Sequence, residues 1–425
     1  MIPLREAQEF VLAACGPLSP QPVPIDEALG CVVATPVLAT EPVPPFVNSS
    51  RDGYALRSRD TEAAGVDGQP VRLTVVGLIM AGSTLDRRIE VGQAARIMTG
   101  APLPDGADAV CMLEDCADEA GGRVVAIDRP LTEGTAVRLV GEDVAAGDTV
   151  AAAGTVLTPG HIGVLANQGM DEVTVHPRPR VGVLSTGDEL VSTSGPLAPG
   201  QIRDANRRVL LALVRREGWI PVDLGIVADD EELLTAALEA AATDCDVVIT
   251  SGGVSVGDLD IVKVVLANQS GGTMRWMQVA IRPAKPFAFG VLDGSDTPVF
   301  GLPGNPVSAM VSFELLVRPA VRRRGGHRSL ERPVVSARAE SDLRRRPDGK
   351  THFVRALCSL DQHGEWRVCP VDGQDSHQLR AMADANALAI LPDGDGVRAG
   401  GVVELMLIDP DRLNASTATS GAHRW

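Results

Sequence analysis

The stretch DVVITSGGVSVGDLDIVK, residues 246–263, indicates how the largest part of this chain folds. Residues 247–249 form a short apolar, β-branched run bounded by polar residues, which predicts a buried strand. A Ser-Gly-Gly turn at 251–253 follows, where glycine lets the backbone turn sharply and approach a ligand. The carboxylates of Asp258 and Asp260 come next. Backbone N–H groups suit phosphate-like anions and carboxylates suit Mg²⁺, so the segment predicts a phosphate site; a tight turn with solvated acids is the alternative.

Strand and helix patterns alternate on both sides of this stretch, over residues 177–326. Apolar runs at 180–184 and 220–229 predict strands, and amphipathic patterns at 203–218 and 230–245 predict helices. Such alternation is typical of a doubly wound parallel sheet with helices on both faces. Ligands of these sheets bind beyond the carboxyl ends of the strands, which is where the quoted stretch has its glycines and acids.

Smaller domains are expected around this α/β domain. Residues 1–45 and 140–176 predict a discontinuous N-terminal linker and helical domain, and short alternating segments at 46–139 predict a small β domain. Alternation returns at 327–411 as a C-terminal β domain, and residues 412–425 are expected to be a disordered tail. The predicted fold class is therefore α/β plus β in a multidomain chain.

Composition excludes several classes of function. The formal net charge of −16 argues against a general nucleic-acid binder, which usually carries a basic footprint. The chain has no run of about eighteen apolar residues, and its N-terminus lacks the pattern of a signal peptide, so no membrane association or secretion is expected. Seven scattered cysteines without a Cys-x-x-Cys pair suggest neither a disulfide framework nor a zinc site, which fits a cytoplasmic location.

Two further loops are expected at the same edge of the sheet. One runs over residues 185–189 and the other over residues 301–308. In the second loop, Asn305 can cap a helix that begins at Pro306, and the free N–H groups of such a helix start suit an anion. Each loop alone could be an ordinary turn, but hydroxyls, glycines and acids on three loops favour a phosphorylated ligand bound with a metal.

The segment AIRPAKPFAFG, residues 280–290, supplies cations. Arg282 and Lys285 are separated by a rigid Pro-Ala turn, and a surface turn is the alternative interpretation of this segment on its own. The seven histidines show no metal-ligand spacing, so structural roles are expected for them.

Seven motifs in one order resemble the molybdopterin molybdenumtransferases, a family whose animal relative is the E domain of gephyrin. They are PPFVNSSRDGYALR (44–57), RIMTGAPLPDGADAV (96–110), GED (141–143), STGDEL (185–190), SGGVSVGD (251–258), RPAKPFAFG (282–290) and GLPGNPVSA (301–309). The resemblance covers residues 1–411 and implies an elongated, four-domain chain that forms a homodimer. It implies insertion of molybdate, as a substrate, into adenylylated molybdopterin, with Mg²⁺ required and AMP released. The upstream molybdopterin adenylyltransferase is a further partner that it suggests.

Position by position, the resemblance implies three groups of site residues. The catalytic residues would be Asp258, Asp260, Lys285 and Glu189, with Asp258 and Asp260 as the metal ligands. The molybdate residues would be Arg282, Lys285, Ser308, Arg355 and Ser376. The substrate-binding residues would be Asp52 and Thr99, contributed by the second subunit of the dimer, together with Ser185, Thr186, Gly187, Asp188, Asp229, Ser251, Gly252, Gly253, Pro303, Gly304, Asn305 and Pro306.

Some positions depart from the family pattern. Family members usually carry an acid in place of Val47, a methionine in place of Arg51 and an aromatic residue after Ile202. The alternative to a molybdate transferase is therefore a divergent paralogue that uses tungstate, or a scaffold that keeps the fold for protein binding. The retained acids and Lys285 favour the enzyme. The upstream adenylyltransferase itself is disfavoured because it resembles the α/β portion alone.

Overall fold

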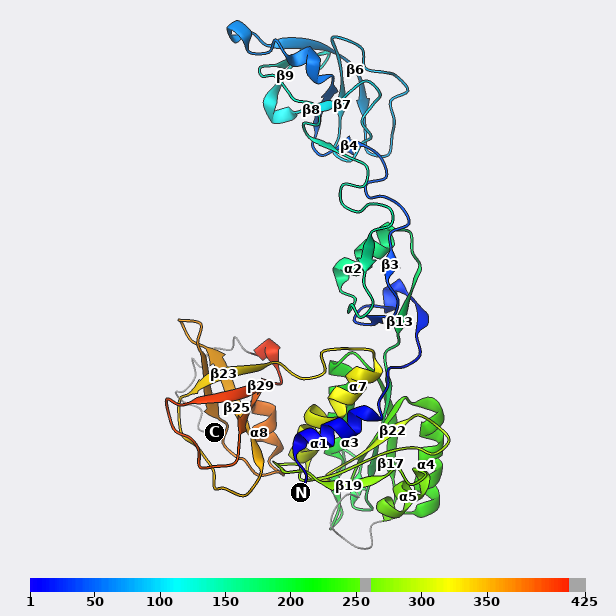
Figure 1. Ribbon diagram of the computed structural model, residues 1–425, viewed down its shortest axis with the longest axis vertical. Coiled ribbons are helices and arrows are strands. Elements are labelled where there is room, and N and C mark those ends of the chain that lie inside the picture. Colours follow the sequence, from blue (N-terminus) through cyan, green and yellow to red (C-terminus); the bar gives the residue numbers. More distant parts are fainter. Residues whose placement is uncertain (253–260, 413–425) are drawn as a thin grey trace. The chain divides into compact units, whose positions relative to one another are not determined.

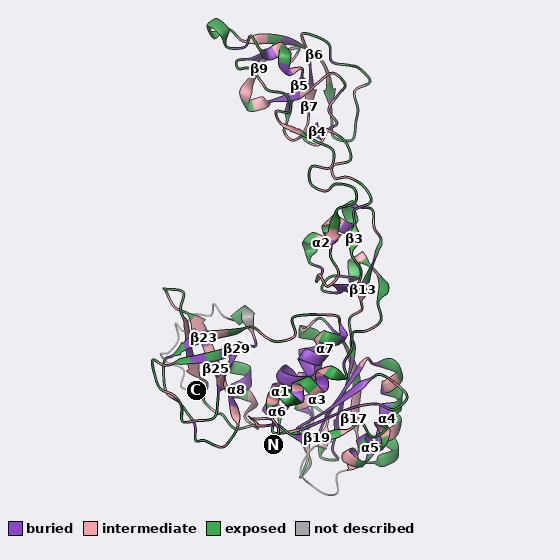
Figure 2. Cartoon of the chain, in the orientation of Figure 1, coloured by how far each residue is buried: buried purple, intermediate pink, exposed green. Residues whose placement is uncertain are grey.

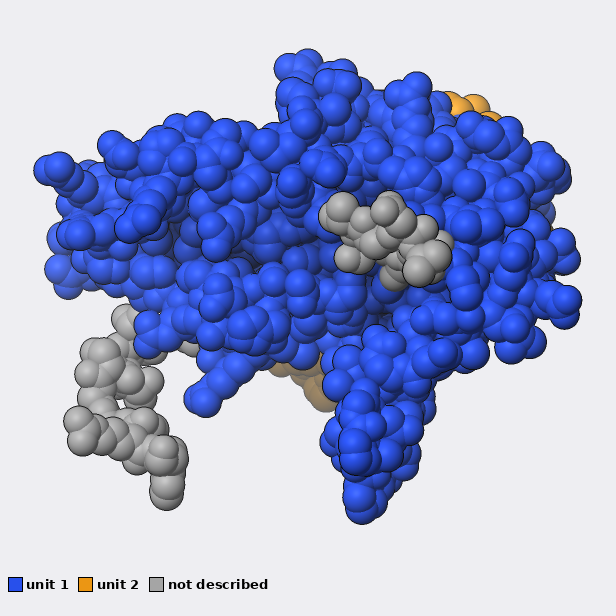
Figure 3. Space-filling view, turned by 90° about the horizontal axis from the view of Figure 1, so that it is seen from below, with its two compact units in different colours: residues 1–23, 30–34, 174–425 blue, residues 24–29, 35–173 orange. Residues whose placement is uncertain are grey.

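A computed structural model of the protein describes residues 1–252 and 261–412 (Figure 1). The chain divides into two compact units, which Figure 3 colours separately. The first unit comprises Met1–Val23, Gly30–Ala34 and Thr174–Trp425, and the second comprises Pro24–Leu29 and Thr35–Val173. The finer division into four domains stays a prediction.

A six-stranded sheet forms the centre of the first unit. In spatial order its strands are β17 (Ile220–Val227), β14 (Arg180–Thr186), β18 (Val247–Ser251), β22 (Pro298–Leu302), β21 (Pro286–Val291) and β19 (Arg275–Gln278). The first four are parallel to one another, as the strand and helix alternation predicted. One edge of the sheet differs from the parallel pattern, because β21 and β19 run antiparallel there. Only six residues connect β21 to β22, and a connection that short joins antiparallel strands, whereas a parallel pair needs a long crossover.

Helices cover both faces of this sheet (Figure 1). One face packs on α1 (Leu4–Ala13), α3 (Ala205–Arg216), α6 (Pro306–Ser312) and α7 (Arg318–Arg324), and the other on α4 (Glu231–Asp244) and α5 (Ile261–Gln269). Side chains of a strand alternate between the two faces, so Val181 and Val183 join the first core and Leu184 joins the second. The four inner strands β14, β18, β22 and β21 are accordingly buried along most of their length, whereas the edge strands β17 and β19 are mostly half-buried or exposed (Figure 2).

The C-terminal part of the first unit is a β barrel. Its strands follow the order β20 (Ile281–Arg282), β25 (Thr351–Leu360), β26 (Trp366–Pro370), β23 (Val334–Ala339), β29 (Val402–Leu407) and β27 (Ala387–Leu391). Pairing of β27 with both β29 and β25 closes the sheet. The short helix α8 is Leu379–Asp384. Strand β20 comes from the α/β part and pairs with β25, so that Arg282 lies opposite His352.

The second unit contains a six-stranded sheet and a short helix. The sheet order is β8 (Ala109–Met112), β5 (Gly53–Leu56), β7 (Gln93–Ile97), β6 (Val71–Ile79), β10 (Val124–Ile127) and β9 (Cys116–Glu119). The helix α2 (Pro159–Asn167) begins after Thr158, whose side chain forms a capping box with His161. Among the described residues, no helix combines the length and the apolarity needed to cross a bilayer.

Short strands complete the chain. They are β1 (Gln21–Pro24), β2 (Val32–Val33), β3 (Val37–Leu38), β4 (Asn48–Ser49), β11 (Val137–Arg138), β12 (Thr149–Ala151), β13 (Glu172–His176), β15 (Leu190–Val191), β16 (Ile202–Arg203), β24 (Leu343–Arg344) and β28 (Gly396–Val397). The parallel pair of β15 and β16 matters most for the site, because β16 leads directly into α3.

Candidate functional site

A pocket of about 200 Å³ lies at the carboxyl ends of β14 and β18, and we call it the edge pocket. Its position is the one expected for a ligand of a doubly wound sheet. Seven residues predicted from the sequence line it: Ser185, Thr186, Glu189, Ser251, Gly252, Gly304 and Pro306. The fold therefore gathers residues from three separate loops, as predicted.

Two features of the edge pocket suit a polar ligand. The hydroxyl of Thr186 is buried and has no hydrogen-bond partner among the described residues, so it is available to a ligand. Gly252 has a φ of +108°, and a Cβ at this position would lie 2.7 Å from the backbone oxygen of Thr186. Only glycine allows the two loops to approach this closely.

Three acids gather beside this pocket. The backbone N–H of Asp229 donates to the Asp188 carboxylate at 3.2 Å, and Glu189 lines the pocket itself. Burial and the neighbouring carboxylates of Asp188 and Glu189 raise the pKa of Asp229. Repulsion of this kind is relieved by a cation, so the acids are chemically suited to Mg²⁺.

The described acids alone do not form a metal centre. No group of three His, Cys, Asp or Glu side chains is arranged to hold a metal ion within residues 1–252 and 261–412. The predicted ligands Asp258 and Asp260, and the predicted substrate residue Gly253, lie outside the described residues.

A second pocket, of about 600 Å³, contains four of the five residues predicted for an oxyanion. Arg282, Lys285, Ser308 and Ser376 all line it, and we call it the Lys285 pocket. Neither Arg282 nor Lys285 forms an ion pair with a described carboxylate, so both charges remain available to an anion.

The helix start at this pocket differs from the prediction. Asn305 occupies the N-cap of α6, but its side chain accepts no capping hydrogen bond and lines the Lys285 pocket instead. The N–H of Val307 donates to the backbone oxygen of Ser376 at 3.2 Å. One of the N–H groups predicted to be free is therefore used to join α6 to the C-terminal β part, and this contact carries Ser376 to the pocket.

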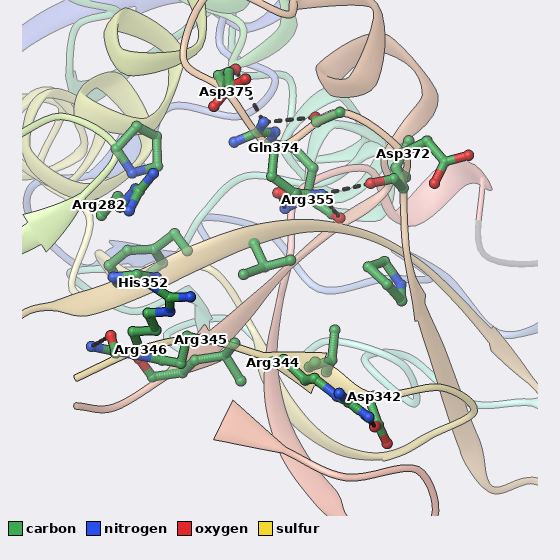
Figure 4. A pocket seen from close by; sticks show the side chains of 18 of the residues that line it. Arg282, Asp342, Arg344, Arg345, Arg346, His352, Arg355, Asp372, Gln374 and Asp375 are labelled. Atoms are coloured by element: carbon green, nitrogen blue, oxygen red, sulfur yellow. Dashed lines mark hydrogen bonds and ion pairs between the residues drawn. The ribbon is translucent and has the colours of Figure 1, made fainter. Parts of the chain in front are cut away.

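The fifth predicted residue, Arg355, lines a neighbouring pocket of about 920 Å³ in the barrel, which we call the arginine pocket (Figure 4). Arg355 is 1% exposed, and its Nη2 donates to the backbone oxygens of Gly373 at 2.8 Å and Asp375 at 3.2 Å. The Nε of Arg355 has no partner among the described residues, and burial lowers the pKa of the Arg355 guanidinium. A buried guanidinium without a carboxylate partner is costly, and an anionic ligand would stabilise it.

Most of the other charges in the arginine pocket neutralise one another. Arg344 pairs with Asp342 at 2.6 Å, and Arg345 pairs with Asp348 at 2.9 Å. His352 also contacts Asp348, at 3.1 Å, while its burial lowers its pKa. The pocket shares Arg282 with the Lys285 pocket, so the two hollows adjoin at that guanidinium.

Several predicted substrate residues lie outside both the edge pocket and the Lys285 pocket. Pro303 is buried. Gly187 leaves room for the Glu189 carboxylate, because a Cβ on Gly187 would lie 2.5 Å from it. Asp52 and Thr99 belong to the second unit, where both the N–H and the hydroxyl of Thr99 donate to Asp52. These two hydrogen bonds lower the pKa of Asp52.

Sequence reasoning missed the residues that open α3. Asp204 and Asn206 line the edge pocket, although no motif had assigned them to it. Asp204 caps α3 by accepting a hydrogen bond from the N–H of Arg207 at 3.1 Å. An Asp immediately before an amphipathic helix is a recognisable cap signal, so it could have placed this helix start at the edge of the sheet.

Comparison with protein families gives three consecutive matches. Residues 2–169 match the MoeA N-terminal region (domain I and II), residues 182–323 match a probable molybdopterin binding domain, and residues 336–408 match the MoeA C-terminal region (domain IV).

Individual relatives are similar over nearly the whole chain. Molybdopterin molybdenumtransferase 2 of Mycobacterium tuberculosis is 40% identical over 416 residues, which cover 96% of this chain and 100% of the relative. The molybdopterin molybdenumtransferase of Haemophilus influenzae is 37% identical, with 91% and 92% covered. Among solved structures, the molybdopterin biosynthesis moeA protein from Pyrococcus horikoshii OT3 superposes with a TM-score of 0.77 at 28% identity, covering 96% of this chain and 100% of that protein.

Proposed function

Because this chain belongs to the molybdopterin molybdenumtransferase family, we propose that it inserts molybdate into adenylylated molybdopterin and releases AMP in a Mg²⁺-dependent reaction. The family is one of transferases that act in molybdenum cofactor biosynthesis. The observation that carries the finer proposal is the gathering of Arg282, Lys285, Ser308 and Ser376 in one pocket.

We propose that the substrate lies across two pockets. Its nucleotide and phosphates occupy the edge pocket. There the Thr186 hydroxyl, which has no partner among the described residues, can bond to the ligand, and Gly252 has no side chain to keep the ligand away from the backbone. Molybdate, a doubly charged oxyanion, occupies the Lys285 pocket, where two cations that pair with no described carboxylate and two hydroxyls can contact its oxygens. Buried Arg355 lines the arginine pocket, which shares Arg282 with the Lys285 pocket.

The residues of the chain would hold the reacting groups in place. Arg282 and Lys285 offset the charge of molybdate while the two thiol groups of the dithiolene form bonds to molybdenum and displace one of its oxygens, which leaves as water with the two thiol protons. Water then cleaves the anhydride between the two phosphates, which separates AMP from the pterin phosphate.

Mg²⁺ fits the acidic side of the edge pocket. We propose Asp258 and Asp260 as its ligands, with Glu189 nearby, because hard carboxylate oxygens are the donors that Mg²⁺ prefers. When bound, Mg²⁺ would neutralise charge on the phosphates. The grouping of Asp188, Glu189 and Asp229 supports this placement: burial, and then the charges of the other two carboxylates, raise the pKa of Asp229, and a cation would stabilise such a group.

AMP release from adenylylated molybdopterin is the direct test. Purified protein should release AMP when molybdate and Mg²⁺ are present, and Asp260→Asn should fold but lose most of this activity. Asp86→Asn, which changes an exposed acid of the second unit, is the matched control and should retain activity. The same assay with tungstate tests the alternative oxyanion. If the wild-type protein releases no AMP with either oxyanion, a protein-binding scaffold without transferase activity is the better explanation.

We further propose a homodimer in which Asp52 and Thr99 of one subunit complete the site of the other. The experiment mixes Asp52→Asn subunits with Asp260→Asn subunits. If the site is shared, half of the sites in a mixed dimer are intact, so random exchange should restore about a quarter of the wild-type activity. If each subunit uses its own Asp52, mixing two inactive variants restores nothing.

A further inference from the structure

The side chain of Asn206 lies between two loops that leave different strands of the central sheet. Its Nδ2 donates to the hydroxyl oxygen of Ser251 and to the backbone oxygen of Gly304, each at 2.8 Å. Ser251 is the last residue of β18, and Gly304 follows β22. One amide nitrogen thus uses both of its hydrogens to hold two loops together.

The two loops lead to different parts of the proposed site. Ser251 and the glycine after it line the edge pocket, where the nucleotide is proposed to lie. Gly304 lines the edge pocket as well, but its loop continues to Asn305 and, three residues further on, Ser308, both of which line the Lys285 pocket. A change in the distance between Ser251 and Gly304 would therefore move one pocket relative to the other.

Asn206 is itself held firmly. It lies in the first turn of α3, two residues after the capping residue Asp204. The Asp204 carboxylate accepts hydrogen bonds from the hydroxyl of Ser185 at 3.0 Å and from Nε of Arg207 at 2.8 Å. Arg207 is 5% exposed, and its Nη2 donates to the hydroxyl of Ser192 at 3.0 Å. The start of α3 is therefore anchored to the β14 side of the sheet, and Asn206 transmits that position to the other two loops.

We propose that Asn206 is a positioning residue for the transfer reaction, which fixes the separation between the nucleotide in the edge pocket and the oxyanion in the Lys285 pocket. This inference rests on the proposed function. An aspartate at this position has no N–H to donate to the Gly304 oxygen, and a glutamine would add a methylene between α3 and the two loops. A shift of about 1 Å in the relative position of reacting groups can cost about a hundredfold in rate, so a fixed separation matters for the reaction.

The test is Asn206→Ala, with the binding of AMP and of molybdate each measured by calorimetry. Loss of the two hydrogen bonds should weaken the binding of both ligands by about three- to tenfold, because a neutral hydrogen bond contributes about 0.5–1.5 kcal/mol. The kcat of AMP release at saturating ligands should fall further, by about tenfold or more, because the reacting groups are no longer held in register. Arg208→Ala, an exposed change in the same helix, is the control and should leave both affinities unchanged.

Two additional variants keep the test decisive. Ser251→Ala removes one of the two acceptors, so its effect and that of Asn206→Ala should be non-additive in the double variant. If Asn206→Ala does not fold, Asn206→Gln replaces it, and the same paired loss of affinity is expected.

A merely structural role predicts a different outcome: the melting temperature falls while the affinities and kcat of the folded protein stay as in wild type. That result, or a change in only one of the two affinities, would overturn the inference. Failure of the proposed function is distinguishable, because it would appear as wild-type protein that binds AMP and molybdate yet releases no AMP from adenylylated molybdopterin.

Discussion

Thr99 donates two hydrogen bonds to a single oxygen of Asp52: its N–H and its hydroxyl both lie 2.7 Å from Oδ1. Both bonds favour the ionised carboxylate, which is why the pKa of Asp52 lies below its ordinary value. The pair is thus preorganised as a fixed negative charge at the surface of the second unit.

Thr99→Val keeps the size and shape of the side chain and removes only the hydroxyl bond. We expect the pKa of Asp52 to rise towards its ordinary value, as measured by NMR titration of the carboxyl carbon. If Asp52 acts in the proposed site, AMP release should also fall, whereas Thr99→Ser should preserve both the pKa and the activity. An unchanged pKa in Thr99→Val would show that the backbone N–H alone sets the ionisation of Asp52.

Lys285→Ala should affect the oxyanion rather than the nucleotide. A charge-assisted hydrogen bond contributes about 1.5–3 kcal/mol, so the molybdate concentration for half-maximal AMP release should rise by roughly ten- to a hundredfold. The affinity for adenylylated molybdopterin, measured by calorimetry, should stay largely intact, and Lys285→Arg should retain more of the molybdate affinity than the alanine variant. Loss of nucleotide binding with unchanged molybdate dependence would instead assign Lys285 to the phosphates.

The acid cluster beside the edge pocket makes a prediction about ionisation. Burial and two neighbouring carboxylates raise the pKa of Asp229, so Asp188→Asn should lower that pKa towards its ordinary value by removing one of the charges. Mg²⁺ should lower it as well if the ion binds at this cluster. NMR titration with and without Mg²⁺ checks both statements, and Asp244→Asn, at the far end of α4, is a control that should change nothing.

A buried ion network should be essential for stability. Glu314 accepts from Arg216 at 2.6 Å and from Arg332 at 2.9 Å, and its side chain is only 1% exposed. Glu314→Gln removes the charge that the two arginines share, while Arg332 keeps its ion pair with Glu217, so the variant should be less stable by about 1–3 kcal/mol in urea unfolding. Glu9→Gln breaks the exposed pair with Arg5 and should cost less than about 0.5 kcal/mol. Equal losses in the two variants would contradict this ranking.

His327 should make the protein sensitive to mild acid. Burial, with the cations Arg322 and Arg318 as neighbours, lowers its pKa to about 4. Because the folded-state pKa is depressed, the stabilisation is present above the unfolded value of about 6.5 and is lost as the pH falls towards 4. His327→Gln should flatten the dependence of unfolding free energy on pH between 6.5 and 4. A wild-type stability that does not change over this range would contradict the assignment.

Local patterns in the sequence determined the central elements. The helix predicted over 203–218 appears as Ala205–Arg216, and the strand in the quoted stretch appears as Val247–Ser251. The gathering of Ser185, Ser251 and Gly304 was also predictable, because all three lie at or just beyond the carboxyl ends of parallel strands, and these ends share one edge. Apolar periodicity and capping residues are visible in short stretches of sequence. The position of the loops then follows from the rule that the carboxyl ends of parallel strands share one edge of the sheet.

Other features were decided only by tertiary structure. Pairing of β20 with β25 sets Arg282 against the barrel, and the bond from the N–H of Val307 to Ser376 carries that serine to the Lys285 pocket. The contacts of Asn206 join segments 45 and 98 residues away in the sequence. None of these contacts has a local signal, because each depends on how non-adjacent strands pair and how helices pack on them. Periodicity in the sequence determines which face of a helix or strand is buried. Only the packed fold determines which residues from distant parts of the chain contact that face.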